Sequence, residues 1–204
     1  SALFVADWGN NKIRRVEVAT GAVTTLAGSG EEGDADGVGE AAEFNDLFGV
    51  TISPDGSALF VADWGNNKIR RVEVATGAVT TLAGSGEKGD EDGIGDAAQF
   101  DGPDGVTISP DSSTLFVADF ANHKIRRVEV ATGAVTTVAG SGAEGSADGV
   151  GDAAQFSHPA TVAVSPDGST LLVRTGTALR QVCVAAPPPP PSFAPIVVPP
   201  STFF

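Results

Sequence analysis

The side chains best suited to catalysis or transition-metal binding are few in this chain. Its 204 residues include two histidines, one cysteine and no tyrosine. Neither His123 nor His158 has a second histidine at the spacing typical of zinc ligands. No serine, histidine and acid combine into a nucleophile with its base. We therefore expect no enzyme activity and no bound cofactor, and we expect His123 to serve in a turn.

Carboxylates are the more abundant candidate ligands. The chain has 26 acidic and 12 basic residues, a net charge of −14, and many of its acids lie in three glycine-containing loops. Carboxylates on a bent loop suit Ca²⁺, and the candidates are Asp34, Asp36, Asp90, Asp92 and Asp148. Their spacing does not fit the twelve-residue helix-loop-helix calcium site. The acidic surface also disfavours nucleic acid as a partner.

A structural role for these loops is the competing interpretation. Each loop contains an Asp-Gly pair that would form a side-chain-stabilised turn, with the glycine at positive φ. A single phenylalanine follows each pair, at Phe44, Phe100 and Phe156. This interpretation predicts that the loop packs against the domain through that ring.

The loops belong to a repeat that organises most of the chain. A Leu-Phe-Val-Ala-Asp segment begins at Leu3, Leu59 and Leu115, and a degenerate copy begins at Leu171, so the period is 56 residues. In the second copy we expect strands at 49–53, 58–63, 68–74 and 78–83, separated by glycine- and asparagine-containing turns. Burying both Ile69 and Val72 would require a bulge near Arg70.

Four short antiparallel strands in each unit predict the blades of a β-propeller, an all-β fold. A right-handed solenoid is the alternative architecture. One blade cannot bury both faces of its sheet, so the first and second strands of neighbouring blades should form a shared core. We count about three and a half blades over residues 1–184, which predicts part of a larger ring, an arc completed by another chain, or a tight four-bladed ring.

The segment LFVADWGNNKIRRVEVATGAVTTLAGSG resembles the NHL-repeat family of β-propellers, and the Asn122-His123-Lys124-Ile125 run is nearest to the core that names that family. The resemblance spans Ser1 to Val184 and implies the propeller fold. Some members of the family are enzymes, notably a zinc-dependent lyase. That lyase uses several histidines and a tyrosine, which this chain lacks.

Three aromatic residues occupy one position of the repeat, at Trp8, Trp64 and Phe120. They are candidate interaction residues, either as a recognition surface on one face or as packing beneath a loop. Asp63 with Arg70 and Arg71 could form ion pairs within or between blades, or could lie solvated at the strand ends.

Residues 185–204 form a proline-rich segment expected to adopt polyproline II. Its five consecutive prolines are candidate modification sites, at Pro187, Pro188, Pro189, Pro190 and Pro191. Proline blocks beside serine resemble the hydroxyproline-rich, O-glycosylated segments of algal and plant cell-surface proteins. Cys183, just before this segment, is either a buried thiol or forms a disulfide with a partner outside these residues.

These features predict a non-catalytic structural or adhesive segment of an extracellular, glycosylated surface or fibre protein. The propeller would bind protein partners and the proline segment would assemble as a rod with other chains. An intracellular scaffold with a proline-rich ligand tail is the first alternative, and a lyase-type propeller enzyme is the second. No apolar run is long enough to span a membrane.

Overall fold

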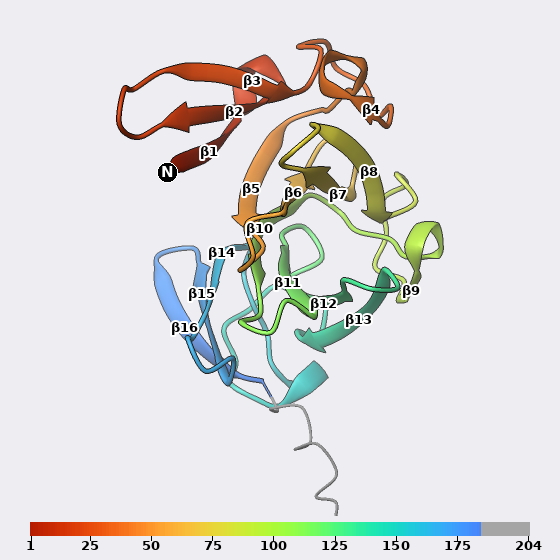
Figure 1. Cartoon of the computed structure of the whole chain (residues 1–204). Coiled ribbons are helices and arrows are strands. Elements are labelled where there is room, and N and C mark those ends of the chain that lie inside the picture. Colours follow the sequence, from red (N-terminus) through yellow and green to blue (C-terminus); the bar gives the residue numbers. More distant parts are fainter. Residues whose placement is uncertain (185–204) are drawn as a thin grey trace, which may run out of the picture.

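The computed structural model describes residues 1–184, which form four antiparallel sheets following one another around an arc (Figure 1). Apart from four single-turn 3₁₀ helices, the regular structure over these residues is β-strand. The predicted all-β propeller is therefore confirmed, with two full blades flanked by two three-stranded blades. The proline-rich segment and its five candidate prolines lie outside the described residues.

The blades repeat one strand order. The second blade consists of β5 (Leu47–Ile52), β6 (Ala58–Asp63), β7 (Lys68–Glu73) and β8 (Ala78–Ala83). The third consists of β10 (Pro103–Ile108), β11 (Thr114–Asp119), β12 (Lys124–Glu129) and β13 (Ala134–Ala139). The first has β1 (Ala2–Asp7), β2 (Lys12–Glu17) and β3 (Val23–Ala27), and the fourth has β14 (Pro159–Val164), β15 (Thr170–Thr175) and β16 (Ala178–Cys183).

A register shift lies at the position predicted for a bulge, but the bulge is on the fourth strand of the blade and not on the third. Ile69 pairs with Ala83, whereas Arg70 pairs with Thr81, so the extra residue is on β8, while β7 pairs with β6 without a break. Ile69 and Val72 are both fully buried. They point to opposite faces of the sheet, Ile69 into the core shared with the third blade and Val72 into the core shared with the first, so the expectation that their burial requires a bulge was wrong.

Neighbouring blades share their cores, as expected. Phe60 of β6 packs in a cluster with Val106 and Leu115 of the third blade. Leu59, one residue earlier on β6, packs toward the first blade with Ile13. Because successive side chains of a strand point to opposite faces, the sheet of the second blade is buried on both sides by its neighbours. Burial of each such side chain contributes about 1.5–3 kcal/mol.

A short fifth strand closes the outer edge of each full blade, a feature that the sequence reasoning did not predict. β4 (Gly37–Val38) pairs with β8, and β9 (Gly93–Ile94) pairs with β13. Each lies in the loop that leads into the blade it covers, and each precedes a 3₁₀ turn, η2 (Gly39–Ala41) or η3 (Gly95–Ala97). Pairing two residues of the outer strand covers part of an open sheet edge.

These short strands correct one expectation about the Asp-Gly pairs. The glycines of the pairs, Gly37 and Gly93, have extended backbones, and positive φ occurs two residues later, at Gly39 (60°) and Gly95 (59°). Gly37 is needed for close approach, since a Cβ there would lie 2.6 Å from the carbonyl oxygen of Ala41. The phenylalanine prediction is confirmed, because Phe44, Phe100 and Phe156 are all buried.

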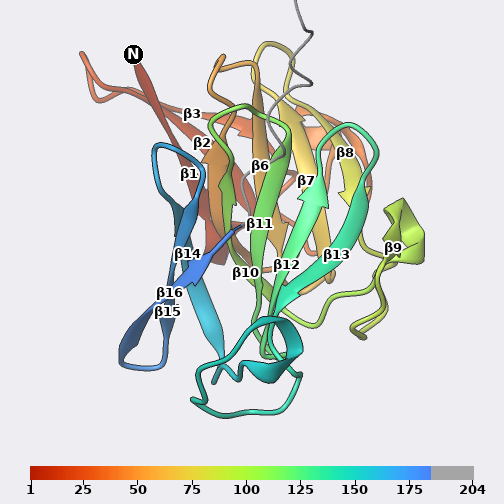
Figure 2. The same ribbon diagram turned by 90° about the horizontal axis from the view of Figure 1, so that it is seen from below.

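The innermost strands β5, β10 and β14 contact one another in that order along the arc. Seen from below, the strands of the second and third blades run side by side (Figure 2). Over the described residues the arc is open at β1, where Leu3 is 59% exposed, while Leu59 at the same repeat position is fully buried. No helix within residues 1–184 has the length and apolar character to cross a membrane.

Candidate functional site

Three segments of each blade meet at one end of the propeller. Leu47, at the start of β5, pairs with Asp63, at the end of β6, so the turn after β6 lies beside the start of the inner strand. The loop that enters the blade reaches the same end. The repeat therefore places Trp8, Trp64 and Phe120 on one common face.

Aromatic rings are in contact across this face. The ring of Phe48 lies 6.3 Å from that of Trp8 and 5.9 Å from that of Trp64, measured between centroids. Trp8 is 57% exposed and Phe48 43% exposed, whereas Trp64 is half-buried. We call these three residues the aromatic surface. Phe120 is half-buried and contacts His158 at 4.7 Å in a separate pair.

Phe48 is the residue of this surface that sequence reasoning missed. It occupies the repeat position held by Asp104 and Ala160 in the next two copies, so its departure from the repeat was the available signal. Gly49 explains why β5 and β10, the inner strands that carry Phe48 and Asp104, lie side by side. A Cβ at Gly49 would lie 2.5 Å from the carbonyl oxygen of Asp104, so only glycine lets the inner strands approach this closely.

A hydrogen bond joins each blade to the next behind this face. The backbone N–H of Asp46 donates to Oδ1 of Asn11 at 3.0 Å, and that of Gly102 donates to Oδ1 of Asn67 at 2.9 Å. In the third copy a histidine takes the asparagine's place. The N–H of His158 donates to Nδ1 of His123 at 3.1 Å.

His123 has a φ of 55°, in the left-handed region that Asn11 and Asn67 also occupy, which agrees with the predicted turn role. Because its Nδ1 accepts a hydrogen bond, its proton must be on Nε2. Burial, with the neighbouring His158, lowers the pKa of His123 below its ordinary value of 6.5. Within residues 1–184 no group of three or more histidine, cysteine or acidic side chains is arranged to hold a metal ion.

The acidic loops are bound to basic side chains of the blade. Asp34 accepts from Lys68 at 2.6 Å, and Asp90 accepts from Lys124. Asp36, Asp92 and Asp148 each accept from an arginine, which is Arg70, Arg126 and Arg180 respectively. All five calcium candidates are thus engaged with cations of the protein itself, and the calcium hypothesis stays a prediction.

In each of the two full blades a buried arginine binds the incoming loop to the sheet. Arg126 is fully buried, and its guanidinium donates to Asp119 at 2.7 Å, to Asp92 at 2.8 Å and to the carbonyl oxygens of Gln99 and Glu91 at 3.0 Å. It also lies 5.3 Å from the centroid of Phe100. Arg70 makes the same contacts in the second blade.

The within-blade ion pair is therefore the correct alternative for Asp63 and Arg70, while Arg71 pairs with Glu73 near the surface. Asp119 is fully enclosed with Arg126. Burial raises the pKa of Asp119 to about 6, although hydrogen bonds from Asn122 and the arginine's charge oppose the rise. The same cause raises the pKa of Asp63. These carboxylates are satisfied structural groups and are not open to a substrate.

The fourth blade also has an arginine equivalent to Arg70 and Arg126, although its copy of the repeat is degenerate. Arg180 donates to Asp148 at 2.6 Å and lies 5.0 Å from the ring centroid of Phe156. The turn between Thr175 and Ala178 is two residues shorter than the corresponding turn of the second blade. Aligning the fourth copy with a two-residue gap would have identified Arg180 from the sequence.

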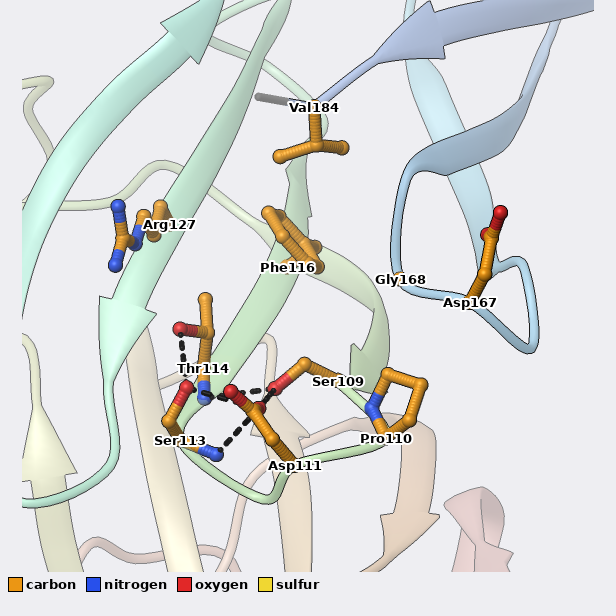
Figure 3. Close-up of a pocket in the computed structure, with 10 residues that line it drawn as sticks. All are labelled: Ser109, Pro110, Asp111, Ser113, Thr114, Phe116, Arg127, Asp167, Gly168 and Val184. Carbon is orange, nitrogen blue, oxygen red and sulfur yellow. Dashed lines mark hydrogen bonds between the residues drawn. The ribbon is translucent and has the colours of Figure 1, made fainter. Parts of the chain in front are cut away.

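A pocket of about 240 Å³ lies at the opposite end of the third and fourth blades (Figure 3). Ser109 and Ser113 both donate to Asp111, and these hydrogen bonds lower the pKa of that carboxyl. The dashed lines in Figure 3 show that these polar groups close the turn on itself. Both histidines are at the other end of the blades, so this pocket offers no nucleophile with a base.

Cys183, at the end of β16, is an exposed free cysteine, which excludes the buried-thiol alternative. The disulfide to a partner outside these residues remains a prediction.

Comparison with known proteins supports an NHL-type propeller. The chain is 36% identical over 144 residues to cattle NHL repeat-containing protein 2, covering 67% of this chain and 20% of that protein. It is 29% identical over 186 residues to the protein SUPPRESSOR OF QUENCHING 1, chloroplastic, of Arabidopsis thaliana, covering 87% of this chain and 18% of that protein. The chain therefore spans about a fifth of these relatives. No family model matches it.

A solved structure supports the fold. An auxiliary nutrient binding protein from Bacteroides thetaiotaomicron superposes with a TM-score of 0.68 at 20% identity, covering 85% of this chain and 42% of that one. A likeness at this identity concerns architecture alone. Together with the repeat sequence and the four sheets, these comparisons support an NHL-type β-propeller.

Proposed function

We propose that this chain is a non-catalytic protein-binding module that presents the aromatic surface to a protein partner. The observation that carries the proposal is the exposure of aromatic rings in tilted contact with one another on a rigid support. Trp8 and Phe48 are exposed by 57% and 43% at the end of well-paired strands. Exposed aromatic side chains at preorganised positions are typical centres of protein interfaces.

The chemistry of the remaining surface supports a binding role over catalysis. The buried carboxylates of the blades are bonded to arginines, and the serines and aspartates of the opposite pocket are bonded within their own turns. His123 has its Nδ1 occupied by a backbone N–H. None of these groups is free to act on a substrate as a base or nucleophile.

Selection of binders from a displayed random-peptide library tests the proposal. The test protein carries Trp8→Ala with Phe48→Ala. A matched control carries Val38→Ala with Ile94→Ala, which removes two rim side chains that are 60% and 64% exposed. Peptides selected on the unchanged chain should bind the control equally and the test protein at least about tenfold more weakly. Selected peptides that bind the test protein undiminished would contradict the proposal.

We also propose, from the proline-rich sequence alone, that the chain belongs to an extracellular glycosylated surface or fibre protein. Mass spectrometry of the native protein checks this at Pro187–Pro191. Hydroxyproline carrying pentoses is the expected result. Unmodified prolines would favour the intracellular scaffold instead.

A further inference from the structure

We propose that the partner segment recognised by the aromatic surface is a cationic peptide, whose lysine or arginine side chains bind between its rings and the carboxylates of Asp46 and Asp104. This inference rests on the proposed binding function and specifies the chemistry of the ligand. Contact geometry, unpaired charge and exposed ring faces support it independently.

Two acidic residues lie next to the aromatic surface along the backbone. The backbone N–H of Trp64 donates to the backbone carbonyl oxygen of Asp46 at 3.1 Å. The backbone carbonyl oxygen of Asp104 would lie 2.5 Å from a Cβ at Gly49, the neighbour of Phe48. The acidic residues Asp46 and Asp104 therefore neighbour the Phe48 and Trp64 pair.

These two acids differ from the acids of the loops. The loop aspartates are held by lysines and arginines at 2.5–2.8 Å, whereas neither Asp46 nor Asp104 forms an ion pair with any side chain of residues 1–184. Asp104 is half-buried, and this desolvation raises its pKa. A partly desolvated carboxylate that is in no close ion pair is stabilised when a partner supplies a cation in contact with it.

The ring faces suit the same ligand. An ammonium or guanidinium group is attracted to the face of an aromatic ring, most strongly to tryptophan. Trp64 is held in place on Gly102, where a Cβ would lie 2.5 Å from its Nε1 atom. Trp8 and Phe48 remain open to solvent on the other side. The net charge of −14 adds a long-range attraction for cationic partners.

The protein has one basic side chain of its own that would compete with a cationic peptide for Asp104. Arg174 is exposed and lowers the pKa of Asp104 by its charge. Its own hydrogen bonds, to Thr161 and to the carbonyl oxygen of Gly176, are long at 3.4 and 3.5 Å. Its removal should therefore strengthen binding of a cationic peptide, an effect that damage to the fold would not produce.

Tryptophan fluorescence provides the test, because both tryptophans of the chain belong to the aromatic surface. Hexa-arginine should change the emission with saturation, whereas hexa-glutamate should not. Asp104→Asn should weaken hexa-arginine binding roughly 3- to 10-fold, and Arg174→Ala should tighten it. Asp152→Asn, an exposed rim residue with the same change in charge, is the matched control and should have a much smaller effect.

The outcomes separate this inference from the proposed function. Equal weakening by Asp104→Asn and Asp152→Asn, or equal binding of hexa-glutamate, would overturn the cationic ligand. If library peptides depend on Trp8 and Phe48 but lack lysine and arginine, the binding function stands and this inference fails. If no peptide depends on those residues, the proposed function itself fails.

Discussion

Replacing Arg126 with methionine should be among the most destabilising single changes in the third blade. The guanidinium is fully buried and donates four hydrogen bonds, two to carboxylates and two to backbone carbonyls. Removing it leaves Asp119 as a buried carboxylate without its cation. Breaking such a pair costs about 3–5 kcal/mol, which is a large fraction of the roughly 5–15 kcal/mol that holds a domain folded.

Urea denaturation of the full chain at pH 7.5 measures this effect. The matched control is Arg127→Met, the next residue on β12, whose side chain is exposed. We expect the control to change the free energy of unfolding by no more than about 0.5 kcal/mol. Equal denaturation midpoints for the two variants would refute the assigned role of Arg126.

The pH dependence gives a second check on the same variant. Asp119 has a folded-state pKa of about 6, above its ordinary 3.8, and loss of the arginine's positive charge must raise it further. The folded variant therefore takes up a proton at a higher pH than the unmodified protein does. Its deficit in stability should shrink as the pH falls from 7.5 toward 6. A deficit that is constant over this range would contradict a buried, uncompensated carboxylate.

Three further predictions concern the end of the propeller that carries the aromatic surface, and its loops. The pKa of His123 is lowered on folding, so the unfolded chain binds its proton more readily, and stability should fall as the pH drops below 6.5. His123→Asn restores the residue of the other copies and should remove that part of the pH dependence in urea titrations. Parallel curves of stability against pH for the two proteins would contradict this. Gly102→Ala introduces a Cβ on a residue with φ 63° and places it against the indole of Trp64. We therefore expect the free energy of unfolding to fall by about 1–2 kcal/mol and the tryptophan emission to shift. An unchanged emission spectrum would show that the indole lies elsewhere. If the loops bind calcium, Ca²⁺ should raise the melting temperature and Asp92→Asn should reduce that rise, whereas a calorimetric titration without heat would exclude the calcium hypothesis.

Much of the fold follows from local sequence. The 56-residue period, the turns and the alternation of apolar residues predicted the strands to within two residues in the second blade. These features are readable because each depends on residues close together in the chain.

Other features depend on contacts between distant segments. The strands β4 and β9 form only because an incoming loop lies against the outer strand of the next blade, and two residues carry no periodic signal. The ring of Phe48 bridges two tryptophans from different blades, which no local pattern predicts. Arg180 was overlooked because a shortened turn shifted it out of the repeat register.

The most direct test of the central claim is a nitrogen-15 NMR titration of the chain with a peptide selected on it. The spectrum contains two indole N–H signals, one each from Trp8 and Trp64. Binding at the aromatic surface predicts that both signals shift along one binding curve, while the backbone amide of Asp111 at the opposite end stays in place. Indole signals that remain fixed while the peptide binds would contradict the account.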